Sequence, residues 1–167
     1  EKKLLLRDLR PGSVLIDERG QARLMDLGLA AAAGDDDGLD AGGGGSSYGT
    51  PEQWAGAAVT EQSDIYCLGL VLYEIFTGRR PFQTDRWADL LRVRQQRPPK
   101  PSQFADGLPA PMDQVIDDCL QPDPDERPAS ALSVLRRLPH ADPLEAILAA
   151  GQTPSPEMVA AASPRAR

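Results

Sequence analysis

The chain has 167 residues, of which 41% are hydrophobic and 26% are charged, a balance that suits one domain or one large lobe with a single core. Its net charge of −7 opposes attraction to phosphates, so no nucleic-acid partner is expected, and an anionic membrane surface is disfavoured for the same reason. The most apolar run, at 65–76, is short and contains Glu74, so no transmembrane segment is expected in this chain.

Two cysteines, Cys67 and Cys119, lie 52 positions apart, and neither belongs to a CxxC motif. This spacing fits neither a zinc site nor a redox pair, so both are predicted to be small core residues. The first residues show no secretory leader pattern. A reducing, cytoplasmic setting is therefore the expectation.

The first predicted element is a β-hairpin. Two short alternating runs, at 13–17 and 21–25, flank a turn with Gly20 at the position that needs a positive φ. The next stretch, 26–56, is rich in Gly, Asp and Ser. It is predicted to be a long, mobile surface loop.

A helix that is apolar nearly all round is predicted at 63–78, capped by Ser63 or Asp64 and ended by Gly78. Such a helix belongs at the centre of a domain. Three further amphipathic helices, separated by proline-rich breaks, are predicted at 84–96, 110–121 and 128–138.

The last part of the chain has the composition of a linker. Residues 139–167 are rich in Ala and Pro, with a short helix candidate at 144–150. We therefore expect a folded unit at 1–138 and a flexible tail at 139–167.

Five short motifs occur in a fixed order along the chain. They are RDLRPGSVLID at 7–17, DLG at 26–28, TPE at 50–52, SDIYCLGLVLYEIFTGRRPF at 63–82 and DERP at 125–128. With these motifs the chain resembles the C-terminal lobe of a eukaryotic-type Ser/Thr protein kinase, of the kind found in bacteria, over about residues 4–138. The resemblance implies a mainly α fold of the α+β family, in which a helical bundle surrounds a buried central helix and a small β-hairpin carries the catalytic loop.

The resemblance also implies transfer of the ATP γ-phosphate to Ser or Thr of protein substrates, with Mg²⁺ as the metal. This chemistry needs a carboxylate for the hydroxyl proton, oxygen ligands for Mg²⁺ and positive charge near the phosphates. Asp8 matches the catalytic-loop aspartate, and Arg10 stands where these kinases carry a lysine. Asp26 matches the main magnesium ligand. Leu15 matches the apolar floor under adenine, although plain core packing would also explain it.

Four further residues match structural positions of the kinase pattern. Arg7 precedes Asp8, as in kinases whose activation loop is ordered by a phosphate that binds this arginine. Glu52 and Arg127 match a buried ion pair. Asp64 matches the aspartate that accepts hydrogen bonds from the catalytic-loop backbone.

The residues just before TPE include three candidate phosphorylation sites, Ser46, Ser47 and Tyr48. A phosphate there would lie near Arg7 if the loop folds back over the catalytic loop. Unmodified surface residues are the alternative.

Several positions that bear on activity depart from the kinase pattern. Leu6 replaces the catalytic-loop histidine, and Ser13 replaces the asparagine that holds the second magnesium ion. A serine hydroxyl is shorter than an amide and is a poorer fixed ligand. Gly45 replaces a threonine that helps to tie the activation segment to Asp8. These departures keep a second function open, a pseudokinase or docking module that lacks phosphotransfer.

The kinase pattern includes a second lobe that this chain does not match. The glycine-rich loop, the strand lysine and its glutamate partner would precede residue 1, so the N-terminal lobe is expected to lie outside the chain. We therefore expect a catalytic-domain fragment that is inactive in isolation. The tail resembles the juxtamembrane linkers of bacterial receptor kinases, which suggests that the whole protein is tethered to a membrane through a segment after the tail.

Overall fold

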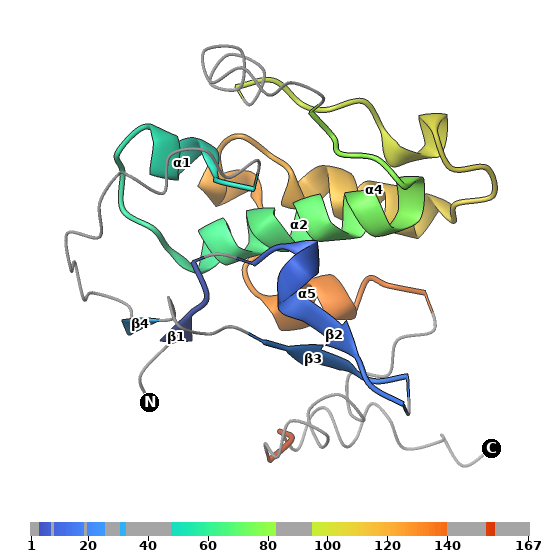
Figure 1. Cartoon of the computed structure of the whole chain (residues 1–167). Coiled ribbons are helices and arrows are strands. Elements are labelled where there is room, and N and C mark those ends of the chain that lie inside the picture. Colours follow the sequence, from blue (N-terminus) through green and yellow to red (C-terminus); the bar gives the residue numbers. More distant parts are fainter. Residues whose placement is uncertain are drawn as a thin grey trace.

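The described part of the chain is built around one long helix. The structure is a computed structural model. It describes residues 4–7, 9–18, 20–25, 31–32, 48–82, 95–139 and 153–155. Figure 1 shows helix α2 in the middle of the molecule, with α4 beside it and α1 near its N-terminal end.

The predicted β-hairpin is confirmed. Strands β2 (Val14–Ile16) and β3 (Ala22–Leu24) pair in an antiparallel manner, with Leu15 opposite Arg23. Gly20 in the turn has a φ of 75°, which residues with a side chain rarely adopt. The turn therefore has its glycine where the chain geometry requires one.

A second antiparallel pairing joins β1 (Leu4–Leu5) to β4 (Ala31–Ala32). Leu5 lies opposite Ala31 and is buried, with 3% of its surface exposed. Strand β4 belongs to the stretch 26–56, and the prediction of a loop throughout that stretch is wrong at these residues.

Helix α2 (Glu61–Thr77) is the predicted central helix, and Gly78 ends it in the left-handed conformation with a φ of 68°. The predicted start at Ser63 or Asp64 is wrong, because the helix begins immediately after Thr60. Ser63 is the third helical residue, and its Oγ accepts a hydrogen bond from the Thr60 N–H at 3.0 Å. The cap thus lies almost one turn earlier than predicted.

Two shorter helices, α4 (Ala110–Cys119) and α5 (Ala131–Leu135), follow α2. Helix α4 agrees with the prediction for 110–121 except at its last two residues. Helix α5 is shorter than the predicted 128–138, because Pro128 favours an extended residue before it and Ser130 is itself extended, with φ −164° and ψ 162°. The Ser130 side chain then caps α5.

The start of α1 (Pro51–Trp54) corrects the loop prediction a second time. Thr50 is fully buried, and its side chain accepts a hydrogen bond from the Gln53 N–H at 3.2 Å. In return, Gln53 Oε1 accepts from the Thr50 N–H at 2.8 Å. This capping box, with proline at the first helical position, starts a helix in a region whose composition otherwise favours a loop.

Three groups of core residues surround α2. The first, which includes residues of α4, consists of Tyr66, Leu70, Tyr73, Phe82, Ile116 and Leu120. The second joins α2, α4 and α5 and consists of Ile65, Val115, Cys119 and Val134. The third consists of Leu9, Cys67 and Val71. Because these groups lie on different faces, α2 buries an apolar surface almost all round, as its sequence predicts.

Both cysteines are buried, as predicted. Burial raises the pKa of the Cys119 thiol to about 12, so this group stays protonated at neutral pH. Cys119 therefore behaves as a small core residue.

Several predicted features lie outside the described residues. The helix predicted at 144–150 falls there entirely, and so does the one at 84–96 except for its last two residues, which are not helical. The division at residue 138 between a folded unit and a tail stays a prediction. Within the described ranges, no helix is both long enough and apolar enough to cross a membrane.

Gly69 allows α4 to lie close to α2. A Cβ at this position would lie 2.7 Å from Cys119 Cβ and 3.0 Å from Leu120 Cδ2. Both neighbours are buried, so they have little room to move. In a sequence, a glycine inside a helical pattern indicates only a weaker helix. The close approach of α4 at Gly69 is therefore not predictable from the sequence.

We predict that Gly69→Ala lowers the free energy of unfolding by about 1–3 kcal/mol, because the added methyl group overpacks the contact between α2 and α4. At an open helical site the same change would raise stability by up to about 1 kcal/mol. Urea unfolding followed by circular dichroism measures the difference. Gly12→Ala is the control, since a Cβ there meets no atom within 4 Å. A neutral or stabilising Gly69→Ala would show that the two helices do not pack this closely.

Candidate functional site

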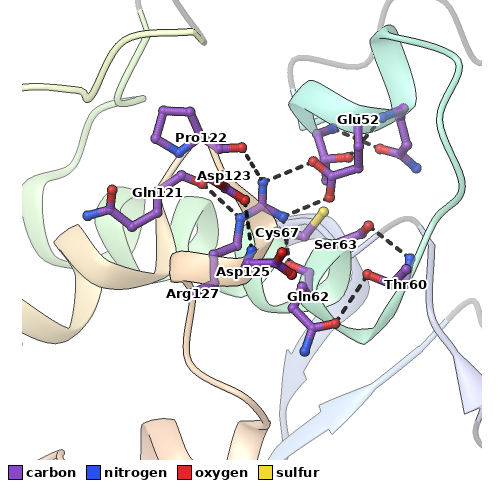
Figure 2. Close-up of polar contacts among 12 residues, drawn as sticks. Glu52, Thr60, Gln62, Ser63, Cys67, Gln121, Pro122, Asp123, Asp125 and Arg127 are labelled. Carbon is purple, nitrogen blue, oxygen red and sulfur yellow. Dashed lines mark hydrogen bonds and ion pairs between the residues drawn. The ribbon is translucent and has the colours of Figure 1, made fainter.

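The Arg127 guanidinium joins parts of the chain that are far apart in the sequence (Figure 2). Its Nη1 and Nη2 donate hydrogen bonds to Glu52 Oε1 at 2.7 Å and to Glu52 Oε2 at 2.9 Å. Nη1 also donates to the Gln62 carbonyl oxygen at 2.9 Å. Nε donates to Gln121 O at 2.8 Å, and Nη2 donates to Pro122 O at 3.0 Å. The expected ion pair between Glu52 and Arg127 is therefore present.

This ion pair is almost completely removed from water. The Arg127 side chain is 0% exposed and the Glu52 side chain is 8% exposed. The guanidinium carbon also lies 4.7 Å from the centre of the Tyr66 ring, at cation–π distance. Burial by itself raises the pKa of Glu52, but the hydrogen bonds from Arg127 and Ser63 outweigh it and lower the pKa below its ordinary value. Removal of either partner would leave an uncompensated buried charge.

Asp64, in the first turn of α2, binds the backbone just before Asp8. Its Oδ2 accepts a hydrogen bond from the Leu6 N–H at 2.8 Å, and its Oδ1 accepts one from the Arg7 N–H at 2.9 Å. Burial raises the pKa of Asp64, while these two N–H groups act in the opposite direction. The contact expected between Asp64 and the catalytic-loop backbone is present.

The residues on either side of Asp8 are fixed in different ways. Arg7 has a φ of 62°, the left-handed region that residues with a side chain seldom occupy. Leu9 is 8% exposed and packs against Cys67 and Val71 of α2. Helix α2 thus holds the backbone around Asp8 in two ways, through hydrogen bonds to Asp64 and through apolar packing against Leu9.

Gln53 of α1 also contacts the backbone just before Asp8. Its Nε2 donates a hydrogen bond to the Arg7 carbonyl oxygen at 3.2 Å. Gln53 is not among the residues that the sequence analysis assigns to the site. The order Thr-Pro-Glu-Gln at 50–53 is a capping-box signal that could have predicted the short helix, although not its contact with Arg7.

Ser13 lies at the end of the 3₁₀ helix η1 (Pro11–Ser13) and is 7% exposed. Its backbone oxygen accepts a hydrogen bond from the Met25 N–H at 2.8 Å. Met25 is the residue before Asp26 in the sequence.

Leu15 is half-exposed, and plain core packing therefore does not explain it. Other large apolar residues of the hairpin are exposed as well, namely Ile16, Leu24 and Met25. Arg10 is also exposed. Leu15 and Arg10 are therefore both accessible to solvent.

Several assigned residues lie outside the described residues. These are Asp8, Asp26, Gly45, Ser46 and Ser47. Among the residues that are described, no group of three or more His, Cys, Asp or Glu side chains is arranged to hold a metal ion, and this set does not contain the two aspartates. Their roles stay predictions.

Tyr48 is described, and its hydroxyl donates a hydrogen bond to Glu74 Oε2 of α2. Burial and the Glu74 carboxylate both raise the pKa of Tyr48. The Tyr48 carbonyl oxygen accepts from Cys67 Sγ at 3.4 Å, so the residue is tied to α2 at two points. The sequence shows Glu74 only as a polar interruption of an apolar helix, so its contact with Tyr48 is not predictable from the pattern.

Comparison with known proteins agrees with the resemblance. Residues 1–137 match the family described as "Protein kinase domain". Serine/threonine-protein kinase PknB of Mycobacterium tuberculosis is 34% identical over 152 residues, which cover 86% of this chain and 24% of PknB. PknD of the same organism is 38% identical over 130 residues, which cover 75% of this chain and 19% of PknD. A probable serine/threonine-protein kinase of Streptomyces coelicolor is 37% identical over 132 residues, which cover 75% of this chain and 19% of that protein.

The chain therefore belongs to the protein kinase family, and its fold is that of part of a protein kinase domain. Its relatives place it with the bacterial eukaryotic-type serine/threonine kinases. The chain spans between 19% and 24% of the length of these relatives.

We predict that ionised Glu52 contributes stability that is lost in acid. Folding lowers the Glu52 pKa, so the contribution is complete above the ordinary value of 4.5 and disappears as the pH falls through the lower folded-state pKa. The Glu52→Gln variant should therefore lose less of its remaining stability than the wild type between about pH 5 and pH 3. Urea unfolding at a series of pH values measures this, with exposed Glu126→Gln as the matched control. Identical pH dependence in Glu52→Gln and the wild type would contradict the prediction.

Proposed function

We propose that this chain is the C-terminal lobe of a bacterial Ser/Thr protein kinase, and that the whole protein transfers the ATP γ-phosphate to Ser or Thr residues of other proteins. The observation that carries the proposal is the pair of hydrogen bonds from Leu6 N–H and Arg7 N–H to Asp64. They fix the backbone that leads into Asp8, where the chemistry needs a carboxylate in a defined position.

Each assigned side chain has a role in this proposal. Asp8 orients the substrate hydroxyl and accepts its proton. Arg10, which is exposed, supplies positive charge near the transferred phosphate, with a planar fork in place of the point charge of a lysine. The half-exposed Leu15 provides an apolar floor for adenine.

The oxygen donors of Asp26 and Ser13 suit Mg²⁺, which prefers hard oxygen ligands. The backbone bond between Met25 and Ser13 supports their assignment to one site. When bound, Mg²⁺ would neutralise charge on the phosphates. Because the serine hydroxyl is short and the residue is buried, the second magnesium position should be the weaker one.

A second candidate function is a docking module without phosphotransfer. Ser13 favours this function, because it replaces an amide ligand with a short side chain that is only 7% exposed. Leu6, in place of a histidine, favours it as well. In this case the contacts of Glu52 and Asp64 would serve the scaffold alone.

The kinase proposal also implies a cytoplasmic lobe with access to ATP and to protein substrates. The net charge of −7 disfavours nucleic acid as a substrate or partner. A membrane tether beyond the Ala- and Pro-rich tail follows from analogy of composition, and cell fractionation of the whole protein would test it.

The kinase proposal predicts Asp26-dependent phosphate transfer by the protein as the cell expresses it. With radiolabelled ATP, Mg²⁺ and a general protein substrate, the wild type should label Ser or Thr. Asp26→Ala and Asp8→Asn should each reduce the rate by about 100-fold or more, because they remove the metal ligand and the proton acceptor. Exposed Asp125→Asn is the matched control.

Two results would reject the enzymatic function. One is labelling by the wild type that survives Asp26→Ala. The other is the absence of any labelling by wild-type protein that circular dichroism shows to be folded, which would favour the docking module.

A further inference from the structure

The side chain of Gln53 makes two hydrogen bonds of opposite sense. Its Oε1 accepts from the Thr50 N–H at 2.8 Å, and its Nε2 donates to the Arg7 carbonyl oxygen at 3.2 Å. Because only the nitrogen of an amide donates, these two partners define the orientation of the group. Gln53 therefore connects the start of α1 with the catalytic loop.

The Arg7 carbonyl belongs to the peptide bond that joins Arg7 to Asp8. Arg7 adopts a left-handed φ of 62°, a conformation that costs free energy in a residue with a side chain and persists only where the surroundings hold it. Asp64 of α2 holds the Arg7 N–H at 2.9 Å, and Gln53 of α1 holds the Arg7 carbonyl oxygen. Helices α2 and α1 thus bind the backbone N–H and the backbone carbonyl oxygen of Arg7, respectively.

The chemistry of Gln53 is informative because glutamate would serve the helix cap equally well. A carboxylate at the third helical position accepts from the capping residue's N–H, and it also interacts favourably with the helix dipole. A carboxylate has no proton to donate, however, so it cannot bind the Arg7 carbonyl oxygen. Only the amide satisfies Thr50 and Arg7 together.

We propose that Gln53 is a positioning residue for the phosphotransfer reaction, and this inference rests on the proposed function. Its bond to Arg7 couples the docking of the segment at 48–54 to the backbone geometry at Asp8. When the segment is docked, the left-handed conformation of Arg7 is held by hydrogen bonds at both its N–H and its carbonyl oxygen. When the segment leaves, the Arg7 carbonyl oxygen loses this donor, and the backbone that leads to Asp8 can relax.

The variant Gln53→Glu separates the two bonds, because it retains the acceptor for Thr50 and removes the donor to Arg7. In the whole protein we expect kcat to fall about tenfold, which corresponds to one lost hydrogen bond in the transition state. The KM for ATP and the melting temperature should change little. Gln103→Glu, at an exposed position, is the matched control for the added charge.

A second measurement does not depend on activity. Trypsin can cut after Arg7, whereas the Arg10 bond is followed by proline and resists cleavage, so the fragment that begins at Asp8 is diagnostic. Gln53→Glu should be cut after Arg7 at least about threefold faster than the wild type and Gln103→Glu, because local opening is more frequent. Gln53→Met, which removes the donor without adding charge, should be cut faster as well, with a lower melting temperature because it also loses the side-chain acceptor for the Thr50 N–H.

The outcomes separate this inference from the proposed function. Failure of the folded wild type to transfer phosphate would reject the proposed function, and the cleavage rates would still decide whether Gln53 holds Arg7. Wild-type cleavage rates in both Gln53 variants would overturn the inference. Faster cleavage in an active protein whose kcat is unchanged would also overturn it, because Gln53 would then be a structural residue only.

Discussion

Five hydrogen bonds fix the buried guanidinium of Arg127 to Glu52 and to three backbone carbonyl groups (Figure 2). A charge that is fully removed from water is tolerated only when its hydrogen-bonding groups are satisfied, and the rigid fork of an arginine requires each acceptor in a particular direction. The short helix α1, the start of α2 and the chain after α4 must therefore come together around Arg127.

The contacts with the backbone of Leu6 and Arg7 follow from this arrangement. Gln62, whose carbonyl oxygen binds Arg127, is two residues before Asp64, which binds the backbone N–H groups leading into Asp8. Glu52 is one residue before Gln53, which binds the Arg7 carbonyl oxygen. The Glu52–Arg127 ion pair fixes helix α1 and the start of α2. It therefore indirectly fixes Gln53 and Asp64, the two residues that bind the backbone of Arg7. The residues that bind Arg127 and the residues that bind the backbone before Asp8 are thus neighbours in the same two helices.

Sequence patterns predict features that depend on one or two neighbouring residues, such as the left-handed glycines Gly20 and Gly78. The family resemblance also indicates which residues pair, and the contact of Asp64 with the loop backbone is an example. Features that depend on how elements pack are not predictable in this way. The close approach at Gly69 needs the position of α4, and the second bond of Gln53 needs the position of Arg7.

The central claim is that the Glu52–Arg127 pair organises the lobe, and a double-mutant cycle tests it most directly. Urea unfolding would be measured for the wild type, Glu52→Gln, Arg127→Met and the double variant. We expect each single change to cost about 3–5 kcal/mol, and the double variant to fall short of the sum by about 2 kcal/mol or more. If the loss in the double variant equals the sum of the two single losses within about 0.5 kcal/mol, Glu52 and Arg127 act independently. This result would contradict the account.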